Sequence, residues 1–211
     1  MANMGVVAAL LGRNDAIFAD KLNHASLNDA AVLARAEFNR YAHQDLFQLE
    51  KMLAASTASR KLVIVDAVFS MDGDIAPVPE LLAICEKYDA YLLLDDAHGF
   101  GTLGATGAGA GEEQGCQDEI DLYFSTFAKS MASIGAFMAG PRTIIDYISY
   151  NIRSQIFAKS LPMPYVVGNL KRLELLRSKP ELKDNLWKNA LALQNGLKER
   201  GFDIGKTDSV V

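Results

Sequence analysis

One stretch decides the fold. It opens with LLLDDAHGFGTLG (residues 92–104) and closes with YFSTFAKSMASIGAFMAG (residues 123–140). Each segment begins with a short apolar run, which is typical of a strand buried on both faces of a parallel sheet. Similar strand patterns alternate with helix patterns along the rest of the chain. The sequence therefore predicts an α/β fold, with a mostly parallel sheet flanked by helices.

Polar groups follow both apolar runs, at the edge of an open α/β sheet where ligands collect. They include the carboxyl group of Asp95, the imidazole of His98, the hydroxyl of Thr126 and the amine of Lys129. This set matches the needs of pyridoxal phosphate, because a lysine amine forms a Schiff base and a carboxylate partners the pyridinium nitrogen. Polar strand ends that merely face solvent are the alternative, and spacing alone leaves it open.

The literal residues resemble a known family. DDAHGFGTLG (residues 95–104) and STFAKS (residues 125–130) are similar to motifs of the α-oxoamine synthases. These are fold-type-I pyridoxal phosphate enzymes that condense an amino acid with an acyl-CoA and release carbon dioxide. The second motif is most similar to the serine C-palmitoyltransferase branch, because relatives that use glycine or alanine usually read T-L-G-K or T-F-G-K there. The resemblance runs through nearly all of the chain and implies a central fragment, about the middle half of a usual member.

The resemblance implies three catalytic residues. Lys129 would hold the cofactor and act as the general base. Asp95 would pair with the ring nitrogen, since the family motif places this partner three positions before the histidine. Asp96 would point to the opposite face of the strand, because adjacent strand residues alternate. His24, in DKLNHAS, would stack on the ring and contact the substrate carboxylate, although a lone loop histidine is more often a solvated or capping residue.

Further cofactor-binding residues follow from the same resemblance. Ser70 and His98 would bind the ring oxygen, and Thr126 would hold the phosphate. An ordinary strand-to-helix connection is the alternative for the SMDGDIAP loop that begins at Ser70. AHQD (residues 42–45) resembles the family's H-N-D, and we interpret His43 as structural and its Asp as a helix cap. Asp66 stands where the family often has Glu, and its role is left open.

The charge, the cysteine positions and the length of the apolar runs limit the classes of function that the sequence favours. The 211 residues carry a formal net charge of −5 and no basic cluster, so nothing favours a nucleic-acid partner. Cys85 and Cys116 are isolated and form no metal-ligand or redox spacing, so we expect no metal site and a reducing cytoplasm. The apolar run at residues 5–11 is too short to span a bilayer, while peripheral membrane contact stays open. The glycine-rich segment at residues 104–117 lacks a dinucleotide-binding frame, and we expect it to wrap the surface.

The resemblance also implies domains, substrates and partners. We expect residues 1–160 to form the large cofactor-binding domain without its N-terminal part, and residues 161–211 to form linker helices and the start of the C-terminal small domain. The expected substrates are L-serine and a long-chain acyl-CoA, giving 3-oxosphinganine in sphingolipid biosynthesis, in a homodimer. Sister enzymes such as 8-amino-7-oxononanoate synthase or glycine C-acetyltransferase are the alternatives. A non-catalytic partner subunit is a further alternative. The presence of Lys129 is evidence against it, because such subunits typically lose this lysine.

Overall fold

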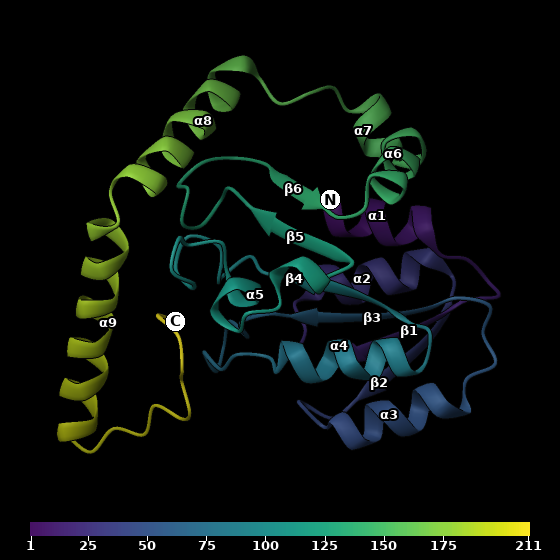
Figure 1. Ribbon diagram of the computed structural model, residues 1–211, viewed down its shortest axis with the longest axis horizontal. Coiled ribbons are helices and arrows are strands. Elements are labelled where there is room, and N and C mark those ends of the chain that lie inside the picture. Colours follow the sequence, from purple (N-terminus) through teal and green to yellow (C-terminus); the bar gives the residue numbers. More distant parts are fainter.

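A six-stranded sheet organises residues 1–211, all of which the computed structural model describes (Figure 1). The strand order is β2-β1-β3-β4-β5-β6, in which the first five strands run parallel and β6 pairs antiparallel with β5. The predicted α/β fold is confirmed. The strands are β1 (Ala16–Asp20), β2 (Glu37–Tyr41), β3 (Lys61–Asp66), β4 (Tyr91–Asp95), β5 (Leu122–Thr126) and β6 (Ala136–Ala139).

Helices cover both faces of this sheet. One core contains side chains from α1, α2 and α6, and the other contains side chains from α3 and α4. Alternate residues of β3 enter opposite cores, as Ile64 and Val65 do, because successive strand side chains point to opposite faces. The helices are α1 (Ala2–Leu10), α2 (Ala25–Ala34), α3 (Leu46–Ala55), α4 (Val78–Lys87), α5 (Ala110–Glu113), the 3-10 helix η1 (Gln117–Glu119), α6 (Arg142–Asn151), α7 (Arg153–Phe157), α8 (Met163–Ser178) and α9 (Glu181–Glu199).

Two local predictions were wrong. The apolar run KLVIVDAVF predicts one strand over residues 61–69, but β3 ends at Asp66. Beyond it the chain turns back on itself, because Val68 forms an antiparallel bridge with Ile75. The glycine-rich segment at residues 104–117 is buried over much of its length instead of wrapping the surface.

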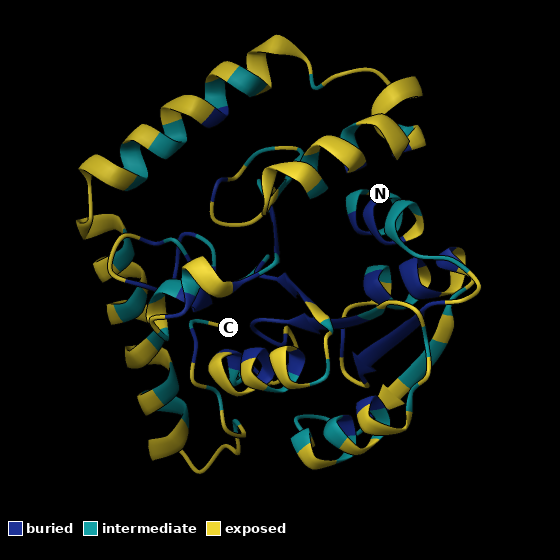
Figure 2. Cartoon of the chain, turned by 45° about the vertical axis from the view of Figure 1, so that its right-hand side comes forward, coloured by how far each residue is buried: buried dark blue, intermediate teal, exposed yellow.

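Helices α8 and α9 form an arm beside the sheet, and Figure 2 shows that most of its surface is exposed. The arm contacts the loop between β4 and α5 through α9. The indole Nε1–H of Trp187 donates to the carbonyl of Thr102 at 2.7 Å, and Lys183 donates to the carbonyl of Ala105 at 3.1 Å. The tail after α9 then returns to the sheet side, where the backbone N–H of Asp208 donates to the carbonyl of Gly73 at 3.1 Å. No helix combines the length and apolar character needed to cross a membrane.

Candidate active site

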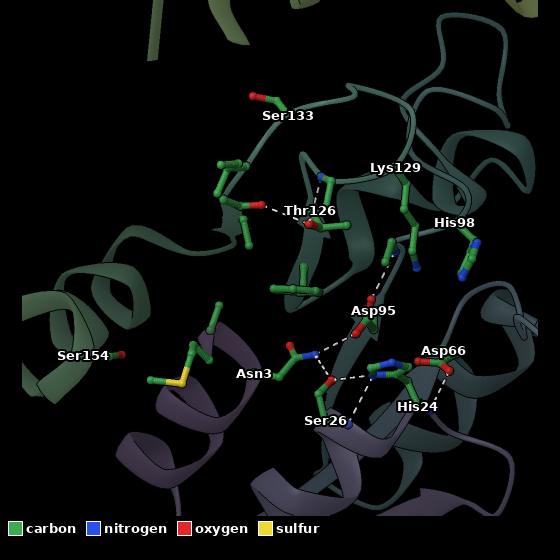
Figure 3. Close-up of a pocket in the computed structure, with 18 of the residues that line it drawn as sticks. Asn3, His24, Ser26, Asp66, Asp95, His98, Thr126, Lys129, Ser133 and Ser154 are labelled. Atoms are coloured by element: carbon green, nitrogen blue, oxygen red, sulfur yellow. Dashed lines mark hydrogen bonds between the residues drawn. The ribbon is translucent and has the colours of Figure 1, made fainter. Parts of the chain in front are cut away.

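A cavity of about 750 Å³ lies at the carboxyl ends of β3, β4 and β5 (Figure 3). These strands are parallel neighbours, and Asp66 of β3 is in register with Asp95 of β4. The residues that follow each strand therefore project toward one space. All six candidate cofactor-binding residues line the cavity: His24, Ser70, Asp95, His98, Thr126 and Lys129.

Asp95 is held inside the cavity by donors from two directions. Its Oδ2 accepts a hydrogen bond from Nδ2 of Asn3 at 2.7 Å, and its Oδ1 accepts one from the backbone N–H of Ala97 at 3.1 Å. Burial raises the pKa of Asp95, which is only 5% exposed, while both hydrogen bonds favour the ionised form and oppose that rise. The carboxylate is thus fixed in position and aimed at the cavity.

The neighbouring Asp96 lies on the other side of the strand. It is fully buried, and its Oδ2 accepts hydrogen bonds from the N–H of Ala110 at 2.7 Å and the hydroxyl of Tyr123 at 2.9 Å. Burial raises the pKa of Asp96 to about 6. This carboxyl group ties α5 to the sheet and does not line the cavity, as strand alternation predicts.

Lys129 follows β5 and extends into the space between Asp95 and His98 (Figure 3). Burial lowers the pKa of Lys129, although the negative charges of Asp95 and Asp66 oppose this effect. A lysine with a lowered pKa holds a larger share of neutral amine, which is the nucleophilic and basic form. The environment therefore prepares this amine for covalent attachment to a carbonyl carbon.

Two imidazole rings reach the cavity, those of His98 and His24. Burial, together with positive charge at Lys129 and His24, lowers the pKa of His98 to about 4, so its ring is neutral at pH 7. His24 is the N-cap of α2, because its Nδ1 accepts the backbone N–H of Ser26 at 3.2 Å. With Nδ1 accepting, a neutral His24 ring carries its proton on Nε2.

Thr126 and Ser70 also reach the cavity. The hydroxyl of Thr126 donates to the carbonyl of Gly135 at 2.9 Å and accepts the N–H of Ala128 at 3.1 Å. To donate to a phosphate oxygen, this hydroxyl must release Gly135. Ser70 reaches the cavity from the turn that follows β3.

Asn3 and Asp66 line the cavity but were not assigned functional roles from the sequence. The only signal for Asn3 was a lone amide in the apolar helix ANMGVVAAL. Asp66 accepts the backbone N–H of His24 at 2.8 Å, which fixes the start of α2. Burial and the nearby charge of Asp95 raise the pKa of Asp66 to about 8, so it is mostly protonated at pH 7.

The cavity fits pyridoxal phosphate in size and chemistry. Its volume is within the usual range of small-molecule sites, roughly 300–1,000 Å³. Oδ1 of Asn3 and Oγ of Ser133 are buried without a hydrogen-bond partner in the chain, so the wall offers free polar atoms to a ligand. A buried acid, a neutral imidazole and a partly neutral lysine amine on one wall are the groups that this cofactor requires.

Comparison with known proteins agrees with this geometry. The family model "Aminotransferase class I and II" matches residues 2–210. The chain belongs to this family. Among class I and II aminotransferase relatives, it is 51% identical to the cysteate-C-fatty acyltransferase of Capnocytophaga ochracea, over 99% of the chain and 51% of that protein. It is 55% identical to the 8-amino-7-oxononanoate synthase of Methylobacillus flagellatus, over 83% of the chain and 44% of that protein.

A solved structure of the same family matches nearly the whole fold. This is a serine palmitoyltransferase variant from S. paucimobilis with a bound pyridoxal phosphate–myriocin aldimine. The two chains are 34% identical with a TM-score of 0.93, and the match covers 98% of this chain and 52% of the other. The resemblance to α-oxoamine synthases is confirmed. The chain spans about half the length of the curated relatives it matches.

Proposed function

We propose that the chain is the cofactor-binding part of a pyridoxal phosphate-dependent α-oxoamine synthase. Such an enzyme condenses an amino acid with an acyl-CoA thioester and releases coenzyme A and carbon dioxide. One observation carries the proposal: the amine of Lys129, the carboxylate of Asp95 and the imidazole of His98 converge on one cavity from adjacent strands. The match to a family whose solved member holds pyridoxal phosphate supports the same cofactor here.

The cofactor supplies an electron sink for the negative charge that develops on the substrate α-carbon. Lys129 removes the α-proton, because its lowered pKa leaves a share of neutral amine to act as the base. Asp95 holds a proton on the ring nitrogen, and Asn3 orients the carboxylate for that contact through its hydrogen bond to Oδ2.

The remaining residues bind and orient. The imidazole of His98 is neutral at pH 7. Together with the hydroxyl of Ser70, it would hydrogen-bond the oxygen on the pyridine ring of pyridoxal phosphate. His24 would lie over one face of the cofactor ring and orient the substrate carboxylate, and Asp66 holds the His24 backbone in place. Thr126 binds the phosphate once its hydroxyl leaves the carbonyl of Gly135.

For the substrates we propose L-serine and a long-chain acyl-CoA, which would give 3-oxosphinganine. The structural match to a serine palmitoyltransferase supports this choice. Cysteate is a second candidate amino acid, favoured by the 51% identity to the cysteate-C-fatty acyltransferase over 99% of the chain. An 8-amino-7-oxononanoate synthase activity is a third, given 55% identity over 176 residues.

Product mass separates these substrates. The protein that carries this chain should be offered serine, cysteate, alanine or glycine, each with palmitoyl-CoA and with pimeloyl-CoA. A product only from serine and palmitoyl-CoA supports the first choice. A sulfonated product from cysteate would replace it with the second, and a product from alanine and pimeloyl-CoA with the third.

The cofactor assignment has its own test. Purified chain mixed with pyridoxal phosphate should gain absorbance near the visible edge, and borohydride should fix the cofactor to one peptide, which contains Lys129. Lys129→Ala should remove the covalent product, while Lys159→Ala serves as the matched lysine control. Fixation at another lysine in the wild-type chain would refute the assignment.

We also propose the domain division and the homodimer. Residues 1–160 would be the large domain, and residues 161–211 linker helices and the start of a small domain. Exposed aromatic side chains on α6 and α7, Tyr150 at 81% and Phe157 at 74%, offer an apolar surface for a second copy. Light scattering measures the mass in solution. A monomeric, fully active protein would end the dimer proposal.

A further inference from the structure

The chain that carries Ser70 forms a short hairpin at the end of β3. Val68 bridges Ile75, and the N–H of Phe69 donates to the carbonyl of Asp74 at 3.0 Å. The N–H of Gly73 donates back to the carbonyl of Phe69 at 2.8 Å. Ser70 begins the turn of this hairpin and lines the cavity, so the position of the turn sets the position of its hydroxyl.

His43, which follows β2, touches both ends of that turn. Its ring packs edge-to-face on Phe69 with centroids 4.4 Å apart. Its Nε2 lies 2.7 Å from Oδ2 of Asp74, and its Nδ1 lies 3.1 Å from Oδ1 of Asp20 at the end of β1. Gln44 adds a second contact from the same loop, through Nε2 to the carboxylate of Asp74. The imidazole thus links the hairpin to the sheet.

The charges around His43 favour a protonated ring. Both ring nitrogens face carboxylate oxygens, which only accept hydrogen bonds, so both can be satisfied at once only by the imidazolium form. Burial by itself lowers the pKa of His43, but the hydrogen bonds to Asp20 and Asp74 outweigh it and raise the pKa above its ordinary value. Asp20 is 1% exposed and also accepts the N–H of Gln44 at 2.8 Å, so it is a fixed anchor.

We propose that His43 is a positioning residue, which holds the hairpin of residues 67–76 against β1 so that the Ser70 hydroxyl faces the cofactor cavity. The inference rests on the proposed function and goes beyond it, because His43 lies outside the cavity lining. Without the imidazole, the carboxylates of Asp20 and Asp74 lose the cation between them. Their repulsion then favours movement of the hairpin. The contacts that remain on it include those of Gln44 with Asp74 and Ile75 and of the Asp208 N–H with the carbonyl of Gly73.

Calorimetric titration of the cofactor-free chain with pyridoxal phosphate tests the inference. His43→Phe keeps the aromatic contact with Phe69 but loses both hydrogen bonds, and we expect the Kd to rise roughly tenfold. Asp74→Ala breaks only the hairpin side and leaves buried Asp20 with its partner, so it is the variant of choice if His43→Phe unfolds. Lys87→Ala, which removes an exposed ion pair with Glu50, is the control and should keep the wild-type Kd.

A double-mutant cycle separates positioning from general loss of stability. If His43 acts through Ser70, then His43→Phe should weaken binding less than twofold in a Ser70→Ala background. If His43→Phe weakens pyridoxal phosphate binding equally in both backgrounds, the inference is wrong. A wild-type Kd in both His43→Phe and Asp74→Ala would also overturn it, and either result would leave the proposed function standing. Failure of the wild-type chain to bind pyridoxal phosphate would overturn the proposed function, and this inference with it.

Discussion

The carboxyl edge of β3–β5 and the arm of α8 and α9 show two ways in which one sequence is ordered. At the edge, polar side chains are buried and held by partners far away in sequence, as Asn3 holds Asp95. In the arm, the only buried residue is Asn169 of α8, and α9 has none. Leu193 of α9 belongs to a row of apolar residues that recur every three or four positions, a spacing typical of an apolar helix face, yet it is 65% exposed. A periodic pattern therefore specifies a helix, whereas only contacts across the fold specify where a side chain lies.

The largest expected effect compares one leucine from each region. Leu93→Ala in β4 leaves a cavity in a fully buried core and should lower the free energy of unfolding by about 2–5 kcal/mol. Leu193→Ala on the arm should change it by less than about 0.5 kcal/mol, because the side chain is mostly exposed. Urea unfolding measures both. A large loss from Leu193→Ala would show that the arm is packed in solution, for example against a second copy.

The second effect sharpens the comparison within the edge itself. Asp95→Asn should lower turnover of the active protein by roughly a hundredfold, because an amide cannot hold a proton on the ring nitrogen. Asp96→Asn should lower turnover far less and mainly reduce the melting temperature, since its contacts are to Ala110 and Tyr123. Steady-state kinetics and thermal melts separate the two. The reverse order would mean that the wrong face of β4 has been assigned.

A third, smaller effect compares two buried asparagines, one from each region. Asn3→Ala removes the 2.7 Å hydrogen bond to Asp95 and should weaken pyridoxal phosphate binding by about 1.5 kcal/mol, the lower end of the range for hydrogen bonds to charged groups. Asn169→Ala in α8 loses only a 3.5 Å contact to the carbonyl of Ile134 and should leave binding unchanged. The Kd of each variant is the measurement. Similar losses of pyridoxal phosphate affinity in both variants would show that the hydrogen bond between Asn3 and Asp95 has no specific effect on cofactor binding.

The last effect is spread over several pH units, as a change in the pH dependence of stability at Asp66. The arm offers no matched variant, because α8 and α9 hold no buried carboxyl group. The folded pKa of Asp66 is about 8, above its ordinary value of 3.8. Between pH 4 and pH 8 the carboxyl group of Asp66 is protonated in the folded state and ionised in the unfolded state. Its contribution to the free energy of unfolding is therefore fully present below about pH 4 and is lost as the pH rises to 8. The loss is at most about 1.4 kcal/mol per pH unit.

Asp66→Asn removes this ionisation and should flatten that part of the profile. The cofactor-free variant should gain stability relative to the wild-type chain as the pH rises from 4 to 8. Urea unfolding at several pH values checks this. Parallel profiles for the two proteins would contradict the raised pKa.

The sequence predicted the polar residues at the carboxyl edge of the sheet better than the residues that hold them in place. Asp95, His98 and Lys129 could be placed near one another because parallel strand ends share an edge, and the cavity contains all three. Their catalytic roles stay predictions. Asn3 was missed because its contact joins residues 92 positions apart, which no local pattern records.

For the arm of α8 and α9, the sequence predicts the helix but not the contacts that it makes. The spacing of Leu182, Leu186, Leu193 and Leu197 predicts a helix over residues 180–200, and α9 runs from Glu181 to Glu199. Nothing in that pattern indicated that Trp187 and Lys183 would donate to the carbonyls of Thr102 and Ala105, because those acceptors belong to the backbone. The hairpin after β3 was missed for a related reason. An apolar run has no feature that distinguishes a strand continuing straight from one that turns back.

The return of the tail to Gly73 has a mechanical consequence. Between Lys183 and Asp208 the chain leaves the sheet side and comes back, so hydrogen bonds hold it at the start of α9 and again in the tail after α9. A pulling force applied beyond Asp208 would load its hydrogen bond to Gly73 before any strand of the sheet is strained. The turn that carries Ser70 would then be the first part of the site to feel tension, while Asp95 at the end of β4 and Lys129 in the connection after β5 would keep their geometry.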